Sequence, residues 1–223
     1  MFSFNKEKRN YKKILDESLF PIQREINKIP EKEIRKFFNI LLDITEKILR
    51  SILFIKNPFN FDKNLNKKDL IFWFENVSLF LIVYSFYCVE IVKKFYNLKI
   101  IYLGEKSSLF WFHDIYNYYN RIFDKKINQN NIDYLASGYK EDIEKGYSQN
   151  KNKIKTNEML KKDIKTISSI LLEGIWNEKF LNNENKGYFL GGRILDGHRQ
   201  VVRPFLEKLA KGNMQKYNLM TED

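Results

Sequence analysis

The stretch from Gly187 to Phe205 holds the residues of this chain that are best suited to chemistry. It contains four of the nine glycines, three of the eight arginines and one of the two histidines. Glycine permits a positive φ or a close approach of two backbones. Arginine binds carboxylate or phosphate through a planar, multidentate set of donors that lysine lacks. We therefore expect residues 187–212 to form a Gly/Arg-rich C-terminal element that contacts a partner, with Arg199 and Arg203 among its binding residues.

Four residues separate Arg193 from His198 within this element. The Arg-x-x-x-x-His spacing resembles the motif of HEPN-type ribonucleases, which are small helical bundles that cleave RNA without a metal, usually as dimers. The resemblance implies that His198 transfers a proton and that Arg193 stabilises phosphate charge. It covers six residues and departs from the family pattern at Ile194, where a polar residue is common, and at Gly197, which interrupts a helix. The alternative is a turn in which Arg193 and His198 make structural hydrogen bonds.

Two further groups of residues are candidates for contact with nucleic acid. The first is a basic helix face made of Lys161, Lys162 and Lys165. It follows the polar segment 146–155, which is predicted to be an exposed loop, and such charge runs are usually solvated surface. The second is the Tyr-rich segment Trp111–Phe123, in which His113 and Arg121 lie among aromatic residues that can stack on bases. Because its apolar residues fall at helical spacing, a core helix bordered by His113 is the alternative.

The net charge of +11 favours a polyanionic partner, because Lys and Arg neutralise phosphates and release counterions. The chain is also rich in Lys, Asn, Ile, Phe and Tyr and has Ala at only two positions, which is typical of an A/T-biased genome. A merely solubilising basic surface is therefore the alternative. The sequence has no glycine loop for phosphate, no His-Glu-x-x-His and no metal-ligand spacing. We expect neither a cofactor nor a metal.

Helical periodicity runs through most of the chain. From Pro30, a good first-turn residue, apolar residues recur every three or four positions until Ile52, and an Asn-Pro pair follows. Similar patterns and capping residues predict further helices over Lys8–Phe20 (ended by Pro21), Asp69–Tyr96, Ser107 or Ser108 to Phe123, Asp133–Lys145, Thr156–Phe180, and from Pro204 to a C-cap at Gly212.

Short extended segments are predicted at two places. Lys99–Leu103 is β-prone. Tyr188–Leu190 faces Arg193–Leu195 across Gly191-Gly192, a pair that suits a two-residue hairpin turn. Neither segment makes a sheet-based fold. We therefore predict a mainly all-α fold, a single helical domain over residues 1–223 built as a bundle, with at most one small β-hairpin near the C-terminus.

The most apolar run, residues 71–89, is about as long as a membrane span. Glu75 and Asn76 lie about a third of the way along it. A charge inside a single span is costly, whereas a helix buried in a bundle tolerates a polar residue near one end. We therefore predict a buried central helix and no integral membrane insertion.

The combined pattern favours a binding protein over an enzyme. The N-terminus lacks the apolar core of a signal peptide, and the single cysteine, Cys88, fits a reducing compartment, so we expect a cytoplasmic protein. The favoured function is contact with RNA or a ribonucleoprotein through the C-terminal region. The alternatives are a HEPN-like, metal-independent endoribonuclease that uses Arg193 and His198, and a protein-only interaction module such as an inhibitor or an assembly subunit.

Overall fold

The computed structural model describes residues 2–54, 67–95, 97–124 and 184–216 of this chain. The predictions for the loop 146–155, for the helices 133–145 and 156–180, and for Lys161, Lys162 and Lys165 lie outside the described residues. Within the described ranges the protein is mainly α-helical, which confirms the predicted fold class.

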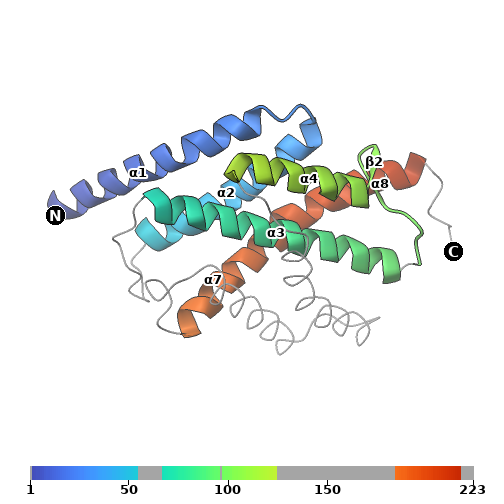
Figure 1. Ribbon diagram of the computed structural model, residues 1–223. Coiled ribbons are helices and arrows are strands. Elements are labelled where there is room, and N and C mark those ends of the chain that lie inside the picture. The colour runs from blue at the N-terminus through green and yellow to red at the C-terminus, as the bar shows by residue number, and fades with distance from the viewer. Residues whose placement is uncertain (1, 55–66, 96, 125–183, 217–223) are drawn as a thin grey trace.

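Long helices crossing one another build this fold (Figure 1). In chain order the elements are α1 (Phe2–Asn27), α2 (Lys32–Phe54), α3 (Lys67–Phe95), β1 (Tyr102–Leu103), β2 (Lys106–Ser107), α4 (Ser108–Phe123), α7 (Glu184–Gly197), the π-helix η2 (His198–Val202) and α8 (Arg203–Lys216). The run α7–η2–α8 crosses α2 and α3 and packs on both of them.

The helices α1 and α2 form an antiparallel pair (Figure 1). The apolar stripe expected of α2 is buried and consists of Ile34, Phe37, Phe38, Leu41, Ile44, Ile48 and Leu49. The predicted end of the first helix at Pro21 is wrong, because α1 continues to Asn27. Proline removes one backbone hydrogen bond, but Ile22 and Ile26 beyond it are buried and extend the stripe begun by Leu15. Packing therefore holds the helix together across the proline.

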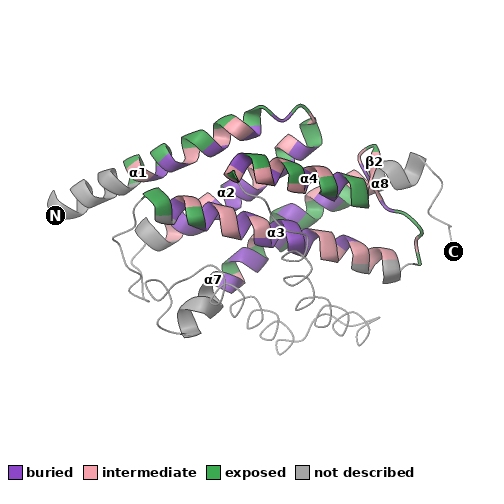
Figure 2. Cartoon of the chain, viewed as in Figure 1, coloured by how far each residue is buried: buried purple, intermediate pink, exposed green. Residues whose placement is uncertain are grey.

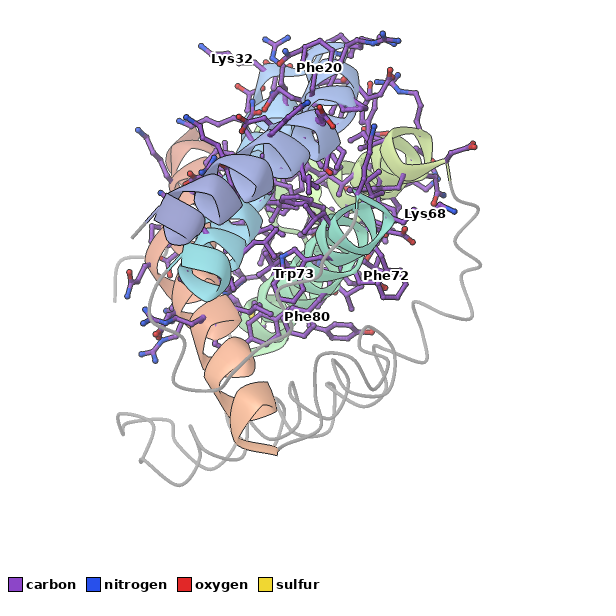
Figure 3. The ribbon with its side chains drawn as sticks, turned by 90° about the vertical axis from the view of Figure 1, so that its left-hand side faces the viewer. Phe20, Lys32, Lys68, Phe72, Trp73 and Phe80 are labelled. Atoms are coloured by element: carbon purple, nitrogen blue, oxygen red, sulfur yellow. The ribbon has the colours of Figure 1, made fainter. Side chains whose placement is uncertain are left out.

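The helix α3 runs through the interior and confirms the predicted central helix. Trp73 is buried and its Nε1 donates a 3.4 Å hydrogen bond to the backbone carbonyl of Thr45 on α2. Figure 3 shows Trp73 turned inward between the helices, whereas its neighbour Phe72 lies on the outer side. Leu70–Glu90 is, among the described residues, the one helix long and apolar enough to cross a membrane, and 56% of its most apolar window is buried within the protein.

A two-residue turn closes the small hairpin β1–β2 ahead of α4. Tyr102 pairs with Ser107 and Leu103 with Lys106 in an antiparallel register. Gly104 opens the turn with a φ of 67°, a conformation that favours glycine at this position of a tight hairpin. The predicted β-prone segment thus contains β1, while β2 was not predicted. The helix α4 then ends at Phe123, as predicted, with Asp124 in the left-handed conformation as its cap.

The hairpin predicted near the C-terminus is wrong, because residues 188–195 belong to the helix α7. The Gly-Gly pair is typical of a turn, but Ile194 and Leu195 just beyond it are buried in the core, and burial of apolar area outweighs a local preference of about 1 kcal/mol. Gly212 is not a C-cap either, since α8 continues to Lys216. One glycine in a helix costs about 1 kcal/mol relative to alanine, which does not by itself end the helix.

Gly197 does not form a turn and instead allows close packing between two helices. A Cβ atom at this position would lie 2.6 Å from Cγ2 and 3.4 Å from Cγ1 of Ile44 on α2. Ile44 is buried, and its β-branched side chain has little rotamer freedom in a helix. Glycine therefore allows α7 to approach α2 more closely than any other residue permits.

We expect Gly197→Ala to lower the free energy of unfolding by about 1–3 kcal/mol, because the new methyl group overpacks the contact with Ile44. Urea denaturation measures this change. In a background that carries Ile44→Ala, the same substitution should cost much less, since the clashing side chain is gone. A gain in stability from Gly197→Ala, as expected for an unconstrained helix position, would contradict this packing role.

Candidate functional site

The candidate site lies on the helical run from α7 through η2 to α8. In η2 the amide of Arg203 donates to the carbonyl of His198, five residues earlier, whereas an α-helix uses a spacing of four. Pro204 accounts for this wider turn. In an α-helix its ring would clash with the carbonyl of Gln200, and proline has no N–H to donate to that carbonyl. The wider turn relieves the clash, and the helix continues into α8.

This run has a buried face and an exposed face (Figure 2). The buried positions are Gly191, Ile194, Leu195, His198, Val202 and Leu206. The exposed positions are Arg193, Asp196, Arg199, Gln200, Val201, Arg203, Pro204, Glu207 and Lys208. The three arginines of the predicted C-terminal element therefore reach solvent, and its histidine does not.

His198 packs in the core against α3. Its side chain is 2% exposed, and its ring meets the ring of Tyr84 edge to face, with 4.6 Å between the centroids. The buried Nε2 atom has no hydrogen-bond partner among the described residues. Burial, and to a smaller degree the charge of Arg203, lowers the pKa of His198 to about 3. The imidazole is therefore neutral at physiological pH.

The geometry separates the two residues that carry the ribonuclease resemblance. Both lie on one continuous helical run, contrary to the expectation that the glycines interrupt the helix there. Five helical positions correspond to a rotation of about 140° at 3.6 residues per turn. Arg193 is accordingly exposed while His198 is buried. The two side chains do not share a solvent-facing surface on which a substrate would meet both.

An open pocket lies on the exposed face of this run, and all of its described lining residues belong to the run itself; we call it the C-terminal pocket. Its lining residues are Asp196, Arg199, Gln200, Arg203, Pro204 and Glu207. Within it the Nε atom of Arg203 donates a 2.8 Å hydrogen bond to Oε1 of Glu207, one helical turn later. Arg199 and Asp196 have no such partner among the residues that the structure describes. One cation and one anion thus remain available to a ligand.

Arg199 and Arg203 were predicted as binding residues, and the structure brings them together in this pocket. Sequence reasoning missed Asp196, Gln200, Pro204 and Glu207. These residues are spaced three or four positions apart, which indicates one face of a helix. The spacing was not recognised because a hairpin was predicted at the start of the run.

The other predicted contact residues, His113 and Arg121, lie on α4 and do not line the C-terminal pocket. The side chain of His113 is 69% exposed, and its Nδ1 lies 3.3 Å from Nδ2 of Asn117. The guanidinium of Arg121 lies 4.8 Å from the ring centre of Tyr118 on the same helix.

A polar cluster ties α4 and the hairpin to the turn between α1 and α2. The hydroxyl of Tyr118 donates a 2.6 Å hydrogen bond to Glu31, and Lys106 lies 3.4 Å from Glu31 and 2.6 Å from Asp114. The hydrogen bond from Tyr118, assisted by Lys106, lowers the pKa of Glu31. The hydrogen bond to Asp114 raises the pKa of Lys106. These charges satisfy one another, so we assign the cluster a structural role.

No protein-family model, curated protein or solved structure matches this chain. Among the described residues, no group of three or more His, Cys, Asp and Glu side chains is placed to hold a metal ion. A functional argument therefore depends on the C-terminal pocket and its surroundings.

The burial of His198 predicts a loss of stability in acid. Its pKa is about 3 in the folded protein and 6.5 ordinarily, so the unfolded chain binds a proton between these values while the folded chain does not. The free energy of unfolding therefore falls as the pH is lowered through this window, and the full stability is present above it. We expect His198→Phe, which keeps an aromatic contact with Tyr84, to gain on the order of 3 kcal/mol relative to wild type between about pH 7.5 and about pH 4.

Urea denaturation of both proteins at the two pH values measures the difference between their free energies of unfolding. The titration of other groups cancels in this difference, because both proteins contain them. A difference between variant and wild type that does not change with pH would show that His198 titrates normally and is not held neutral by burial.

Proposed function

We propose that the protein is an intracellular binding protein that contacts RNA, free or within a ribonucleoprotein, through the exposed face of α7, η2 and α8. The observation that carries this proposal is Arg199, an exposed guanidinium in the C-terminal pocket that has no acidic partner among the described residues. Its helix is anchored by the buried residues on the opposite face, so the arginine is presented from a rigid element. A guanidinium held in this way suits bidentate contact with a phosphate.

Two neighbouring features support the proposal. Arg193 and Arg203 are exposed on the same helical run, so a phosphate backbone crossing it meets several guanidinium groups. The net charge of the whole chain is +11, which attracts polyanions at long range. Backbone contacts of this kind position a nucleic acid without reading its sequence.

The burial of His198 favours binding over cleavage. A general acid or base must reach the proton that it transfers, directly or through one water molecule. The imidazole is 2% exposed and packs on Tyr84 in the core, whereas the arginines of the run are exposed. The HEPN-like alternative requires this ring to meet the ribose of the substrate, which would require the helix to leave its place in the core.

We expect the affinity for a single-stranded RNA to fall steeply with salt, and Arg199→Gln to weaken binding and flatten the slope of log K against log salt by about 0.7 for one lost phosphate contact. Fluorescence anisotropy at several salt concentrations measures both quantities. The matched control is Arg24→Gln, an exposed position on α1 that loses the same charge elsewhere. Equal effects of the two substitutions would point to the overall charge and not to the C-terminal pocket.

A protein-only interaction module, the second alternative, predicts no RNA binding in this assay. The enzyme alternative predicts cleavage of the labelled RNA in the presence of EDTA. We expect the RNA to remain intact over the time of the binding experiment. Metal-independent cleavage that disappears in a folded His198→Phe variant would contradict the proposal of a binding protein.

A further inference from the structure

Three large apolar side chains are exposed where the hairpin meets α4. Ile100, Leu109 and Phe110 are 45%, 64% and 67% exposed. Water hydrates exposed charges well, but an exposed apolar side chain is stabilised when it leaves water. Apolar residues exposed singly are ordinary, whereas a contiguous apolar patch on a monomer often marks a binding surface. The placement of the three side chains relative to one another therefore decides what they mean.

The register of the hairpin places two of these residues side by side. The amide of Ser108 donates a 2.7 Å hydrogen bond to the carbonyl of Ile101, so the pairing of β1 and β2 continues by one step. The following step sets Ile100 opposite Leu109, and residues opposite each other have their side chains on the same side. Exposure agrees with this pairing. Ile101 and Ser108 are both buried, and the pair beyond them is exposed on both segments.

Phe110 follows Leu109 directly in the first turn of α4. The three exposed side chains therefore form one surface, to which the loop before the hairpin and the start of the helix both contribute. We call Ile100, Leu109 and Phe110 the hairpin patch.

The charges around the hairpin patch are mainly positive. Residues 93–113 contain four lysines and a single acid, Glu105. Lys93 and Lys106 pair with acids of neighbouring helices and turns. Lys99 directly precedes Ile100, is exposed, and has no ion-pair partner among the described residues. An apolar patch beside such a cation suits a partner that carries negative charge above an apolar layer.

An anionic lipid surface has this combination, because negatively charged headgroups cover its acyl chains. Peripheral proteins generally need two contributions to bind such a surface, and an apolar insertion together with basic charge supplies both. The net charge of +11 also attracts the whole chain toward it at long range.

A second copy of the chain fits the hairpin patch less well. A stable interface between two proteins needs roughly 800 Å² on each partner, which is far more than three side chains expose. The exposed face of α4 does not extend the apolar area, since it continues with His113, Asn117 and Arg121. The limited apolar area and its basic surroundings therefore favour lipid over another protein surface.

We propose that the hairpin patch inserts into an anionic lipid surface, with Lys99 on the headgroups. The three apolar side chains enter the boundary between headgroups and acyl chains, and the helices stay outside it. Binding of this kind is peripheral. It requires neither RNA nor the apolar helix α3, so it goes beyond the proposed function and does not depend on it.

Co-sedimentation of the full chain with lipid vesicles tests this proposal. Vesicles of phosphatidylcholine alone are compared with vesicles that also contain phosphatidylserine. We expect binding to the anionic vesicles that weakens with added salt, and much weaker binding to the neutral ones. This comparison leaves the protein unchanged, so it does not depend on the folding of a variant. Binding to neither kind of vesicle, or equal binding to both, would overturn the proposal.

Replacing both Leu109 and Phe110 by Gln should lower the partition coefficient on anionic vesicles by about tenfold or more, because two apolar side chains no longer leave water. Lys99→Gln should lower it by about fivefold. The matched control is Phe20→Gln, which removes a phenylalanine that is 70% exposed on α1 and should bind as wild type does. Since all the replaced side chains are exposed, urea denaturation should show nearly unchanged stability.

An equal loss of vesicle binding in the double variant and in Phe20→Gln, or no loss in either, would overturn the assignment of the hairpin patch. Sedimentation velocity without lipid tests the other occupant. A dimer of the wild-type chain that dissociates when Leu109 and Phe110 are replaced would show that a second copy covers the patch, and it would overturn the lipid proposal.

Discussion

The contact between Gly197 and Ile44 determines how deeply the C-terminal helical run lies in the protein. A Cβ at residue 197 would come within 2.6 Å of Ile44, so glycine alone allows the backbone of α7 to lie this close to α2. At this depth the next residue, His198, reaches Tyr84 on α3 and fills the space beside it. Helical rotation then turns Asp196 and Arg199, on either side of Gly197 and His198, toward solvent.

The segment from Arg193 to Arg203 therefore supplies both core packing and an exposed basic surface, and its composition alone does not show which residue does which. Arginine and histidine five positions apart suggest joint chemistry on an anionic substrate, but the helix directs them to different environments. The imidazole is a neutral aromatic component of the core, with its pKa lowered to about 3 by burial. Its buried Nε2 has no hydrogen-bond partner among the described residues, which costs on the order of 1–3 kcal/mol that packing must offset. The guanidinium groups of Arg193, Arg199 and Arg203 lie on the exposed side of the run.

Periodicity predicted α2, α3 and α4 well, because each buries an apolar stripe that repeats over several turns. It failed where a local signal competed with packing over a short segment. Gly191-Gly192 is typical of a turn, yet the burial of Ile194 keeps the segment helical, and the hairpin that exists uses Gly104 in a less conspicuous pair. The C-terminal pocket could not be predicted, since which carboxylate pairs with which arginine depends on side-chain geometry. The sequence could indicate Arg199 but not that it lacks a partner among the described residues.

The charges of the described helices show why net charge is a weak guide to function here. Several exposed lysines pair with an acid three or four positions away, as in Lys13–Glu17, Lys28–Glu25 and Lys47–Asp43. Such pairs contribute little stability and leave little local field. The C-terminal pocket is also nearly neutral, with two arginines and two carboxylates in its lining. Affinity for a polyanion must then come from the exposed arginines of the whole run and from the net charge of +11. The part of this affinity that comes from the net charge therefore depends on salt more than the part made by direct contacts, because screening weakens long-range attraction more than hydrogen bonds made in direct contact.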